Sequence, residues 1–254
     1  MEIGAQFFTL RDYCKTLEDF SETLKKVADM GYRTVQISGT CAYEADWLNE
    51  QLVKNGLRCV ITHTAPDKIR DLTEQVIADH KTFGCKYVGI GCAPNGFANG
   101  EADMKALCEI IEKVAEPFAE NDLLLMYHNH ALDFQRGEDG RQYFMRLVED
   151  YTPAQLGFTL DTYWVQAGGL TVPDTIRKLK GRVPCVHLKD MAVRGNSAIM
   201  APVGWGNLDF DAILPACEDA GAKYLLVEQD DCYEENPFDC LKKSYDFLRS
   251  RGLA

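Results

Sequence analysis

Eight short apolar runs, separated by longer amphipathic stretches, constrain the fold of this chain more than any other feature of its sequence. The runs lie at residues 3–8, 34–38, 58–63, 87–91, 123–128, 156–161, 184–188 and 224–228. The clearest helical patterns between them lie at 17–31, 69–84 and 103–121. Several helical patterns end at a glycine, the favoured residue just past a helix, at positions 31, 56, 84 and 221. Strands that are apolar almost throughout, each followed by a helix, are typical of a parallel sheet covered by helices.

Eight such units in 254 residues predict an α/β protein with a single (β/α)8 TIM barrel. The main alternative is an open doubly wound sheet, which usually has fewer strands and often a G-x-G-x-x-G fingerprint after the first one. Here the first run leads into FTLRDYCK, which lacks that fingerprint. Since the composition shows no break and no low-complexity segment, we expect one TIM-barrel domain over residues 1–254.

The overall charge and the cysteines limit the partners and the compartment. The net charge of −12 repels phosphate backbones, so nucleic acid is not an expected partner. No run of 18 apolar residues predicts a membrane span, and the N-terminal MEIGAQFFTLRD does not resemble a signal peptide. The ten cysteines contain no C-x-x-C pair, so we expect reduced, mostly buried thiols and a cytoplasmic location.

Possible metal ligands follow the last four apolar runs. TIM barrels carry their chemistry at the carboxyl ends of the strands, and these ends converge on one mouth. The candidates in chain order are His128 or His130, then Asp161, His187 and Glu228. Two carboxylates with one or two imidazoles suit Mn²⁺, Zn²⁺, Fe²⁺ or Co²⁺. We therefore predict one divalent metal of this group, held by His128, Asp161, His187 and Glu228.

Each candidate also has a structural explanation. His63, at the end of the third run, could be an ordinary packing residue, and Asp161 could cap a helix that begins at TYWVQ. The acidic stretch from Glu228 to Asp231 could be a solvated loop. A metal site is favoured because these explanations require four independent coincidences on four consecutive strands.

The motifs at the strand ends resemble those of a known family. They read GAQFFTLRD, GYRTVQISG, YHNHALDF, LDTYWVQAGG, GRVPCVHLKDM, PVGWGNLDF and VEQD, from the first strand to the last. In these stretches the chain resembles the sugar phosphate isomerase/epimerase group of xylose isomerase-like TIM barrels. The resemblance implies one divalent metal bound by Glu, Asp, His and Glu from strands five to eight. Asp161, His187 and Glu228 match the last three of these ligands.

The chain departs from that pattern at two places. Where many relatives have Glu-Asn on the fifth strand, this sequence has His128-Asn129-His130, so His128, His130 and then Asp133 are the candidates for the fourth ligand. Where many relatives have Glu between two glycines, this chain has Trp205, which could stack on a sugar or plug the barrel mouth.

The family resemblance implies proton transfer beside a carbonyl. Isomerising or epimerising a sugar through an enediolate needs a base, and a second group that returns the proton. We expect Glu228 to be one of these groups and His128 or His130 the other. Lys189 could stabilise the developing negative charge, or it could form an ion pair with Asp161 or Asp190.

The expected substrate is a small sugar or keto sugar. Gln6, His63, Asn129, Trp164 and Trp205 are the candidates for contacts with it. No Gly-rich cradle or arginine pair for a phosphate follows the last two strands. The sequence does not separate isomerisation from β-elimination on a 3-keto sugar or inosose, because both begin with the same proton abstraction.

Two other classes of function use the same barrel. A metal-dependent phosphodiesterase would need more histidine and aspartate ligands and a basic groove, which five histidines and a charge of −12 argue against. A non-catalytic sugar-binding homologue is the other alternative, because the substituted fifth strand departs from the usual ligand set. A homodimer is a possible assembly, although no stretch identifies an interface.

Overall fold

Eight parallel strands close into a barrel in the computed structural model, which describes residues 1–253. The order around the barrel is β1, β10, β7, β6, β5, β4, β3 and β2, which returns to β1. The barrel strands are β1 (Glu2–Gln6), β2 (Thr34–Ile37), β3 (Arg58–His63), β4 (Tyr87–Ile90), β5 (Leu124–His128), β6 (Gly157–Asp161), β7 (Cys185–Leu188) and β10 (Tyr224–Val227). The prediction of a single (β/α)8 TIM barrel is confirmed.

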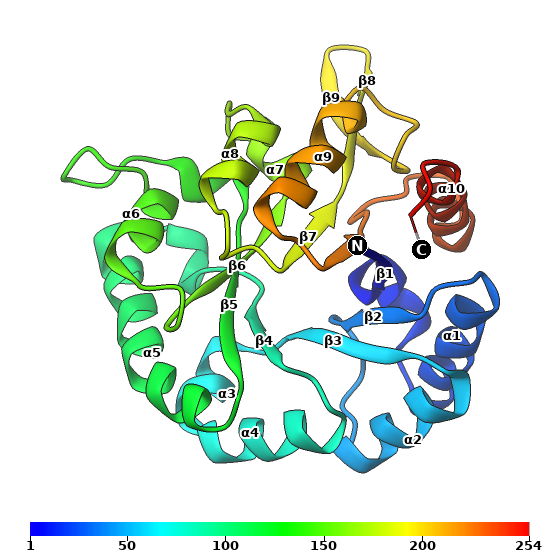
Figure 1. The fold of residues 1–254 in the computed structure, drawn as a ribbon, viewed down its shortest axis with the longest axis horizontal. Coiled ribbons are helices and arrows are strands. Elements are labelled where there is room, and N and C mark those ends of the chain that lie inside the picture. Colours follow the sequence, from blue (N-terminus) through cyan, green and yellow to red (C-terminus); the bar gives the residue numbers. More distant parts are fainter. Residues whose placement is uncertain (254) are drawn as a thin grey trace.

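Helices surround the barrel, as Figure 1 shows. The α-helices are α1 (Leu17–Asp29), α2 (Ala45–Asn55), α3 (Pro66–Asp71), α4 (Thr73–Thr82), α5 (Glu101–Glu120), α6 (Tyr143–Asp150), α7 (Thr162–Ala167), α8 (Val172–Lys178), α9 (Phe210–Ala220) and α10 (Pro237–Ser250). Short 3-10 helices lie at η1 (Phe7–Tyr13), η2 (Pro94–Phe97) and η3 (Ala131–Phe134). Their apolar faces and the outward side chains of the strands form the main hydrophobic core.

The eight predicted strands agree with the observed ones to within two residues at each end, but two connections differ from expectation. The helical pattern at 69–84 is two helices, because Leu72 leaves helical geometry (φ −123°, ψ 38°) between α3 and α4. The connection after β7 contains an unpredicted antiparallel hairpin, β8 (Asp190–Arg194) and β9 (Ser197–Ala201). The hairpin projects beyond the ring of barrel strands (Figure 1).

A small apolar cluster separate from the main core fills the barrel interior. It contains Ile61, Met126, Cys185 and Leu226, from β3, β5, β7 and β10. Because side chains alternate along a strand, the residue two positions further on each of these strands also points inward. The next inward positions are His63, His128, His187 and Glu228, so the cluster forms the floor beneath these residues.

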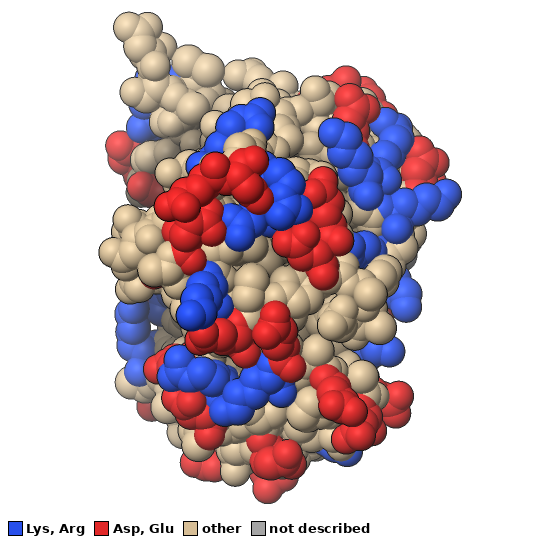
Figure 2. All heavy atoms as spheres, turned by 90° about the vertical axis from the view of Figure 1, so that its left-hand side faces the viewer, with Lys and Arg blue, Asp and Glu red and all other residues tan. Residues whose placement is uncertain are grey.

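The surface carries mixed charge on the face drawn in Figure 2, where acidic and basic side chains lie interspersed. The described residues form many exposed ion pairs, and Arg141 alone contacts Asp139, Glu149 and Asp150. Within residues 1–253, no helix is both long and apolar enough to cross a bilayer.

Candidate active site and metal-ligand cluster

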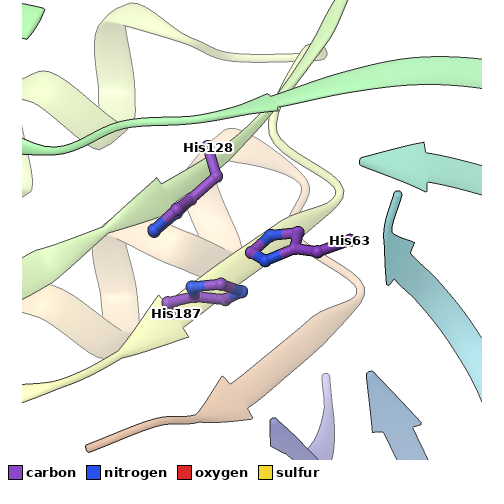
Figure 3. A group of neighbouring side chains, drawn as sticks. All are labelled: His63, His128 and His187. Atoms are coloured by element: carbon purple, nitrogen blue, oxygen red, sulfur yellow. The ribbon is translucent and has the colours of Figure 1, made fainter. Parts of the chain in front are cut away.

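The four predicted ligands lie together at the carboxyl ends of four adjacent strands. His128, Asp161, His187 and Glu228 each offer one ligand atom, and these atoms all lie within 4.8 Å of one another. None of the four residues is more than 3% exposed. A second group of ligand atoms within the same limit combines His63 with His128 and His187. The three imidazoles come from β3, β5 and β7 and gather in the barrel mouth (Figure 3).

Several buried acceptor atoms face one another in this cluster. His187 Nε2 donates a hydrogen bond of 2.6 Å to Gln36 Oε1, which can only accept. Nδ1 lies 2.9 Å from Glu228 Oε2 and 3.9 Å from Asp161 Oδ2, and all three atoms lack a hydrogen bond. Two buried carboxylate oxygens and an imidazole nitrogen this close together form a donor set that fits a divalent metal.

Lys189 supplies positive charge to the same carboxylates. Its ammonium lies 3.0 Å from Asp161 Oδ2, 3.0 Å from Glu228 Oε2 and 2.9 Å from Asp230 Oδ2, and the side chain is 1% exposed. Burial alone would lower the pKa of Lys189, but the three carboxylates raise it above its ordinary value. Of the two ion-pair partners expected from the sequence, Asp161 is found and Asp190 is not.

Of the carboxylates of Glu228 and Asp161, that of Glu228 is the more firmly ionised. Its Oε1 accepts a hydrogen bond of 2.6 Å from Gln6 Nε2. Burial works to raise the pKa of Glu228, but Lys189 and His187 together hold it well below its usual range. By contrast, burial raises the pKa of Asp161 to about 6 despite Lys189. Glu228 is therefore an ionised carboxylate at neutral pH, oriented by Gln6.

Asp161 also caps a helix, as its structural explanation predicted. Its Oδ1 accepts a hydrogen bond of 2.9 Å from the backbone N–H of Trp164 in the first turn of α7. Its own backbone N–H donates to Asn129 Oδ1 at 2.9 Å, which ties β5 to β6. Because the cap uses only Oδ1, Oδ2 remains directed at the cluster.

The ring of His63 is bordered by two glycines and a serine. A side-chain Cβ on Gly91 would lie 2.7 Å from His63 Nδ1, and one on Gly89 would lie 3.1 Å from its Cδ2. Ser38 Oγ lies 3.2 Å from His63 Nδ1, while the buried Nε2 has no hydrogen-bond partner. Burial, together with the charge of His187, lowers the pKa of His63 to about 3, so the ring is neutral.

A cavity of about 500 Å³ opens above the cluster. The residues that line it come mainly from the loops after β1, β3, β4 and β5. They are Gln6, Phe8, Ser38, His63, Thr64, Ala65, Pro66, Gly91, Cys92, Ala93, Pro94, Asn95, His128, His130, Glu228 and Asp230. No lysine or arginine is among them. The cavity is large enough for a monosaccharide and brings five of the predicted site residues to its wall.

His130 lines the cavity beside the cluster but belongs to neither group of ligand atoms. Its ring centroid lies 4.8 Å from that of His128 and 5.4 Å from that of Trp164. Burial, with the charge of Lys189, lowers the pKa of His130 to about 4. Asp133, the third candidate for the fourth ligand, instead accepts hydrogen bonds from Tyr127 Oη at 2.8 Å and from the backbone N–H of His130.

The two tryptophans occupy different places. Trp164 is half-buried, and Lys189 Nζ lies 5.4 Å from its ring centroid, so it stands at the edge of the cluster. Trp205 is 64% exposed, lies beside Lys243 of α10, and is not among the residues that line the cavity. Its role as a substrate contact remains a prediction.

Three residues of the site were absent from the predicted set: Gln36, Ser38 and Asp230. Gln36 orients His187, Ser38 orients His63, and Asp230 binds Lys189. All three stand at or just beyond strand ends, which is the signal that could have included them.

Comparison with protein-family models decides the affiliation. The model described as "xylose isomerase-like TIM barrel" matches residues 24–251. The chain belongs to this family. A comparison with curated protein sequences found no match.

Solved structures share the barrel of this xylose isomerase-like protein at low sequence identity. A sugar phosphate isomerase/epimerase from Parabacteroides distasonis has a TM-score of 0.81 and 20% identity, covering 98% of this chain and 93% of that one. A probable 3-DHS dehydratase from Bacillus anthracis has a TM-score of 0.76 and 16% identity, covering 99% and 100%. D-allulose 3-epimerase from Methylomonas sp. has a TM-score of 0.74 and 13% identity, covering 99% and 98%. At such identities the likeness establishes the fold.

Proposed function

We propose that the chain is a metal-dependent isomerase or epimerase of a small sugar or keto sugar, acting by proton transfer beside a carbonyl. The observation that carries the proposal is the cavity wall, where Glu228 and two neutral imidazoles, His128 and His130, meet next to a buried metal-ligand cluster. Proton transfer in both directions needs two such groups within reach of one substrate. Structural relatives include epimerases of small sugars, which agrees with this chemistry.

His128, Asp161, His187 and Glu228 would hold the divalent ion, which we expect to be Mn²⁺, Zn²⁺, Fe²⁺ or Co²⁺. When bound, the ion would supply Lewis-acid polarisation of the substrate carbonyl, which makes the neighbouring C–H more acidic. Gln36 and Gln6 would keep the donor atoms of His187 and Glu228 in place, since both contacts measure 2.6 Å.

The residues that move protons follow from the ionisation of the site. Glu228 is ionised at neutral pH and can accept the proton, because Lys189 and His187 hold its pKa low. His130 is neutral, lines the cavity and has a free Nδ1, so it can carry the proton at the other position; His128 is the alternative. The Lys189 ammonium, fixed by three carboxylates, would offset negative charge on the enediolate.

The cavity favours an unphosphorylated substrate. Its lining contains Glu228 and Asp230 but no lysine or arginine, and the nearby ammonium of Lys189 is already shared among three carboxylates. A phosphate in the cavity would therefore have no lysine or arginine of the lining to pair with. Gln6, His63, Asn129 and Trp164 remain the proposed polar and stacking contacts for sugar hydroxyls.

Exchange of a carbon-bound hydrogen with solvent tests the proposal directly. The metal-loaded protein is incubated in D₂O with a panel of neutral ketoses, aldoses and 3-keto sugars, and each is followed by proton NMR. We expect deuterium at the carbon beside the carbonyl of at least one sugar, with a new epimer or isomer. Glu228→Gln should reduce this exchange by about 10²- to 10⁴-fold, the usual contribution of a general base.

His80→Gln is the matched control, because His80 is buried in α4 and bonded to Thr62 and to the carbonyl of Val76, away from the cavity lining. Its exchange rate should equal that of the parent protein. Absence of exchange with every sugar, despite stoichiometric metal, would overturn the proposal and favour the non-catalytic sugar-binding alternative.

A lyase is the second candidate, because a relative of nearly the same length carries the name of a dehydratase. Abstraction of the same proton would then be followed by loss of a neighbouring hydroxyl group. The product of such an elimination is an enone. Its absorbance in the near ultraviolet, together with a product mass that is lower by one water, would identify this outcome.

Two further proposals concern the setting of the enzyme. A cytoplasmic location fits the ten cysteines, all of which are free thiols. A homodimer remains the proposed assembly, which sedimentation analysis would test.

A further inference from the structure

We propose that the substrate is a keto glycoside, a sugar that carries an apolar group, and that this group binds the outer wall of the cavity beside β1, β3 and β4. The inference rests on the proposed function and names the class of its substrate. Because the anomeric carbon of a glycoside is an acetal, the reacting carbonyl would lie on another carbon of the sugar ring.

The two halves of the barrel contribute different chemistry to the cavity. The metal-ligand cluster comes from β5, β6, β7 and β10, which follow one another around the ring. The strands β1, β2, β3 and β4 form the other half of the ring. The loops after these four strands supply most of the remaining lining of the cavity. A ligand that fills the cavity therefore touches both halves.

The outer part of the cavity on the β1–β4 side is apolar, and we call it the apolar wall. Its residues lie beyond the strand ends and are Phe8, Ala65, Pro66, Cys92, Ala93 and Pro94. All of them except Ala93 are exposed or half-buried, so they surround the opening. By contrast, Gln6, His128 and Glu228 are at most 3% exposed and lie deeper. The groups that can bind sugar hydroxyls are therefore at the floor, and the apolar surface is at the rim.

The polar side chains between the residues of the apolar wall already have partners within the protein. Thr64 Oγ1 lies 3.0 Å from Thr62 Oγ1, with which it shares a hydrogen bond. Asn95 Nδ2 donates a hydrogen bond of 2.9 Å to Asp103 Oδ1. A sugar hydroxyl placed against this wall would exchange water for few new partners, whereas an apolar group would lose no hydrogen bond there.

The loop after β4, which supplies half of the apolar wall, is held in one shape. Asn95 and Phe97 have left-handed backbones, with φ of 46° and 57°, which residues other than glycine rarely adopt. The buried Asp103 binds both Asn95 Nδ2 and the backbone N–H of Asn99, the latter at 2.7 Å. The ring of Phe97 stacks on that of Tyr143 with centroids 4.6 Å apart. A wall formed in advance binds an apolar group with little further loss of loop entropy.

The size of the cavity agrees with a ligand larger than one sugar. Its volume is about 500 Å³. Cavities of about 300–1,000 Å³ bind ligands of drug size, so a monosaccharide alone would leave part of this one filled with water. A sugar on the floor with an aryl or alkyl group against the apolar wall would use both surfaces. Because the lining contains no lysine or arginine, the added group is expected to be uncharged.

Binding of unreactive glycosides tests the inference apart from catalysis. The methyl and phenyl β-glycosides of glucose, galactose, mannose and xylose lack a carbonyl, so they can bind without reacting. Isothermal titration calorimetry measures the Kd of each for the full-length, metal-loaded protein. We expect the phenyl glycoside of at least one sugar to bind at least about tenfold more tightly than its methyl glycoside, because the phenyl ring buries more apolar surface.

Two variants test whether the phenyl group lies on the apolar wall. Ala65→Asp places a carboxylate on the wall at the N-cap of α3, which lacks a side-chain cap and favours aspartate, so the fold should be kept. Phe8→Ala removes the aromatic ring of the wall. Each should weaken the phenyl glycoside at least about fivefold and the methyl glycoside less than about twofold. Ala154→Asp, at an exposed position outside the lining, is the control and should change neither Kd.

The outcomes separate this inference from the proposed function. Phenyl glycosides that bind no more tightly than the methyl glycosides of all four sugars would overturn the inference, as would a phenyl affinity that Ala65→Asp and Phe8→Ala leave unchanged. If a simple sugar still takes up deuterium in the exchange assay, the proposed isomerase or epimerase activity stands without the apolar group. Absence of exchange with every sugar, 3-keto phenyl glycosides included, would overturn the proposed function and its substrate class together.

Discussion

Lys189 is the residue on which the electrostatics of the site depend. Replacing it with methionine keeps most of its volume but leaves Asp161, Glu228 and Asp230 without their shared cation. We expect Lys189→Met to lower the free energy of unfolding of the metal-free protein by about 3–5 kcal/mol, the usual cost of leaving buried charge unpaired. Urea unfolding measures this change.

The same variant should respond more strongly to metal. With the ammonium removed, a divalent cation can compensate the carboxylates, so Zn²⁺ should raise the Tm of Lys189→Met more than that of the parent. Lys180→Met is the control, because Lys180 is exposed, and its unfolding free energy should change by less than about 0.5 kcal/mol. Equal metal responses in the parent and Lys189→Met would contradict the electrostatic role.

Asp190 illustrates how one side chain organises a whole connection. Its carboxylate accepts hydrogen bonds from the backbone N–H groups of Met191, Gly204, Gly206 and Leu208, at 2.7 to 3.1 Å. It therefore shapes the loop between β9 and α9 that contains Trp205. This contact replaces the ion pair with Lys189 that the sequence suggested.

Removing the carboxylate of Asp190 should make the loop between β9 and α9 more mobile without unfolding the barrel. We expect Asp190→Ala to cost about 2–4 kcal/mol, since several donors lose a charged acceptor. Amide hydrogen exchange should accelerate at residues 203–208 and stay unchanged in the barrel strands. Asp219→Ala is the control, because Asp219 forms an exposed pair with Arg177. Uniform acceleration across all strands would contradict this local role.

Helix α4 should give the stability of the protein a pH dependence. Burial lowers the pKa of His80 to about 4. Between pH 6.5 and 4 the unfolded chain binds a proton at His80 and the folded chain does not, so stability falls as the pH falls through this window. The loss should reach about 2–3 kcal/mol near pH 4.

Urea unfolding at pH 7.5, 6, 5 and 4 measures this dependence in the parent and in His80→Gln. The variant should lack the contribution of His80, so the difference between the two proteins should shrink steadily with falling pH. Parallel stability curves over the whole range would show that His80 is not responsible.

At the scale of elements, the sequence predicted the strands well because each is a continuous apolar run buried on both faces. It missed the break at Leu72 because no glycine or proline marks it, and only the backbone angles of Leu72 reveal it. It missed β8 and β9 because these strands are partly exposed, so they lack the burial pattern of the barrel.

The positions of site residues could be predicted from the sequence only for residues at the ends of strands. Asp161, His187 and Glu228 could be placed because parallel strands end at a common mouth. The contact of Gln36 with His187 could not, because it joins β2 to β7 across the barrel interior and depends on closure. The two residues are 151 positions apart in the chain, so no local sequence pattern indicates that they are in contact.

At the scale of the whole molecule, charge supports the proposal of an unphosphorylated substrate. The chain carries a net charge of −12, and its cavity lining includes carboxylates without lysine or arginine. For the sugar that the exchange assay identifies, we expect kcat/KM to be at least about 100-fold lower for its phosphate ester than for the neutral compound, because the phosphate would meet carboxylates and no lysine or arginine at the cavity wall.

Steady-state assays of the matched pair at several salt concentrations test this expectation. The neutral sugar should react at a rate independent of ionic strength, and added salt should narrow the difference by screening repulsion. A phosphate ester that reacts faster than the neutral sugar would contradict an unphosphorylated substrate.

Gly89 on β4 and Gly91 just after it border the side chain of His63 on the neighbouring strand. A Cβ at Gly91 would meet the His63 ring at 2.7 Å, so the imidazole and the missing side chain occupy one shared volume. In related proteins positions 63 and 91 should therefore change together. A relative that has lost the histidine can carry a side chain at the position just after β4, and a relative with a side chain there should lack the histidine. The residue types at positions 63 and 91 should therefore covary. An alignment of related sequences could test this without any measurement of metal.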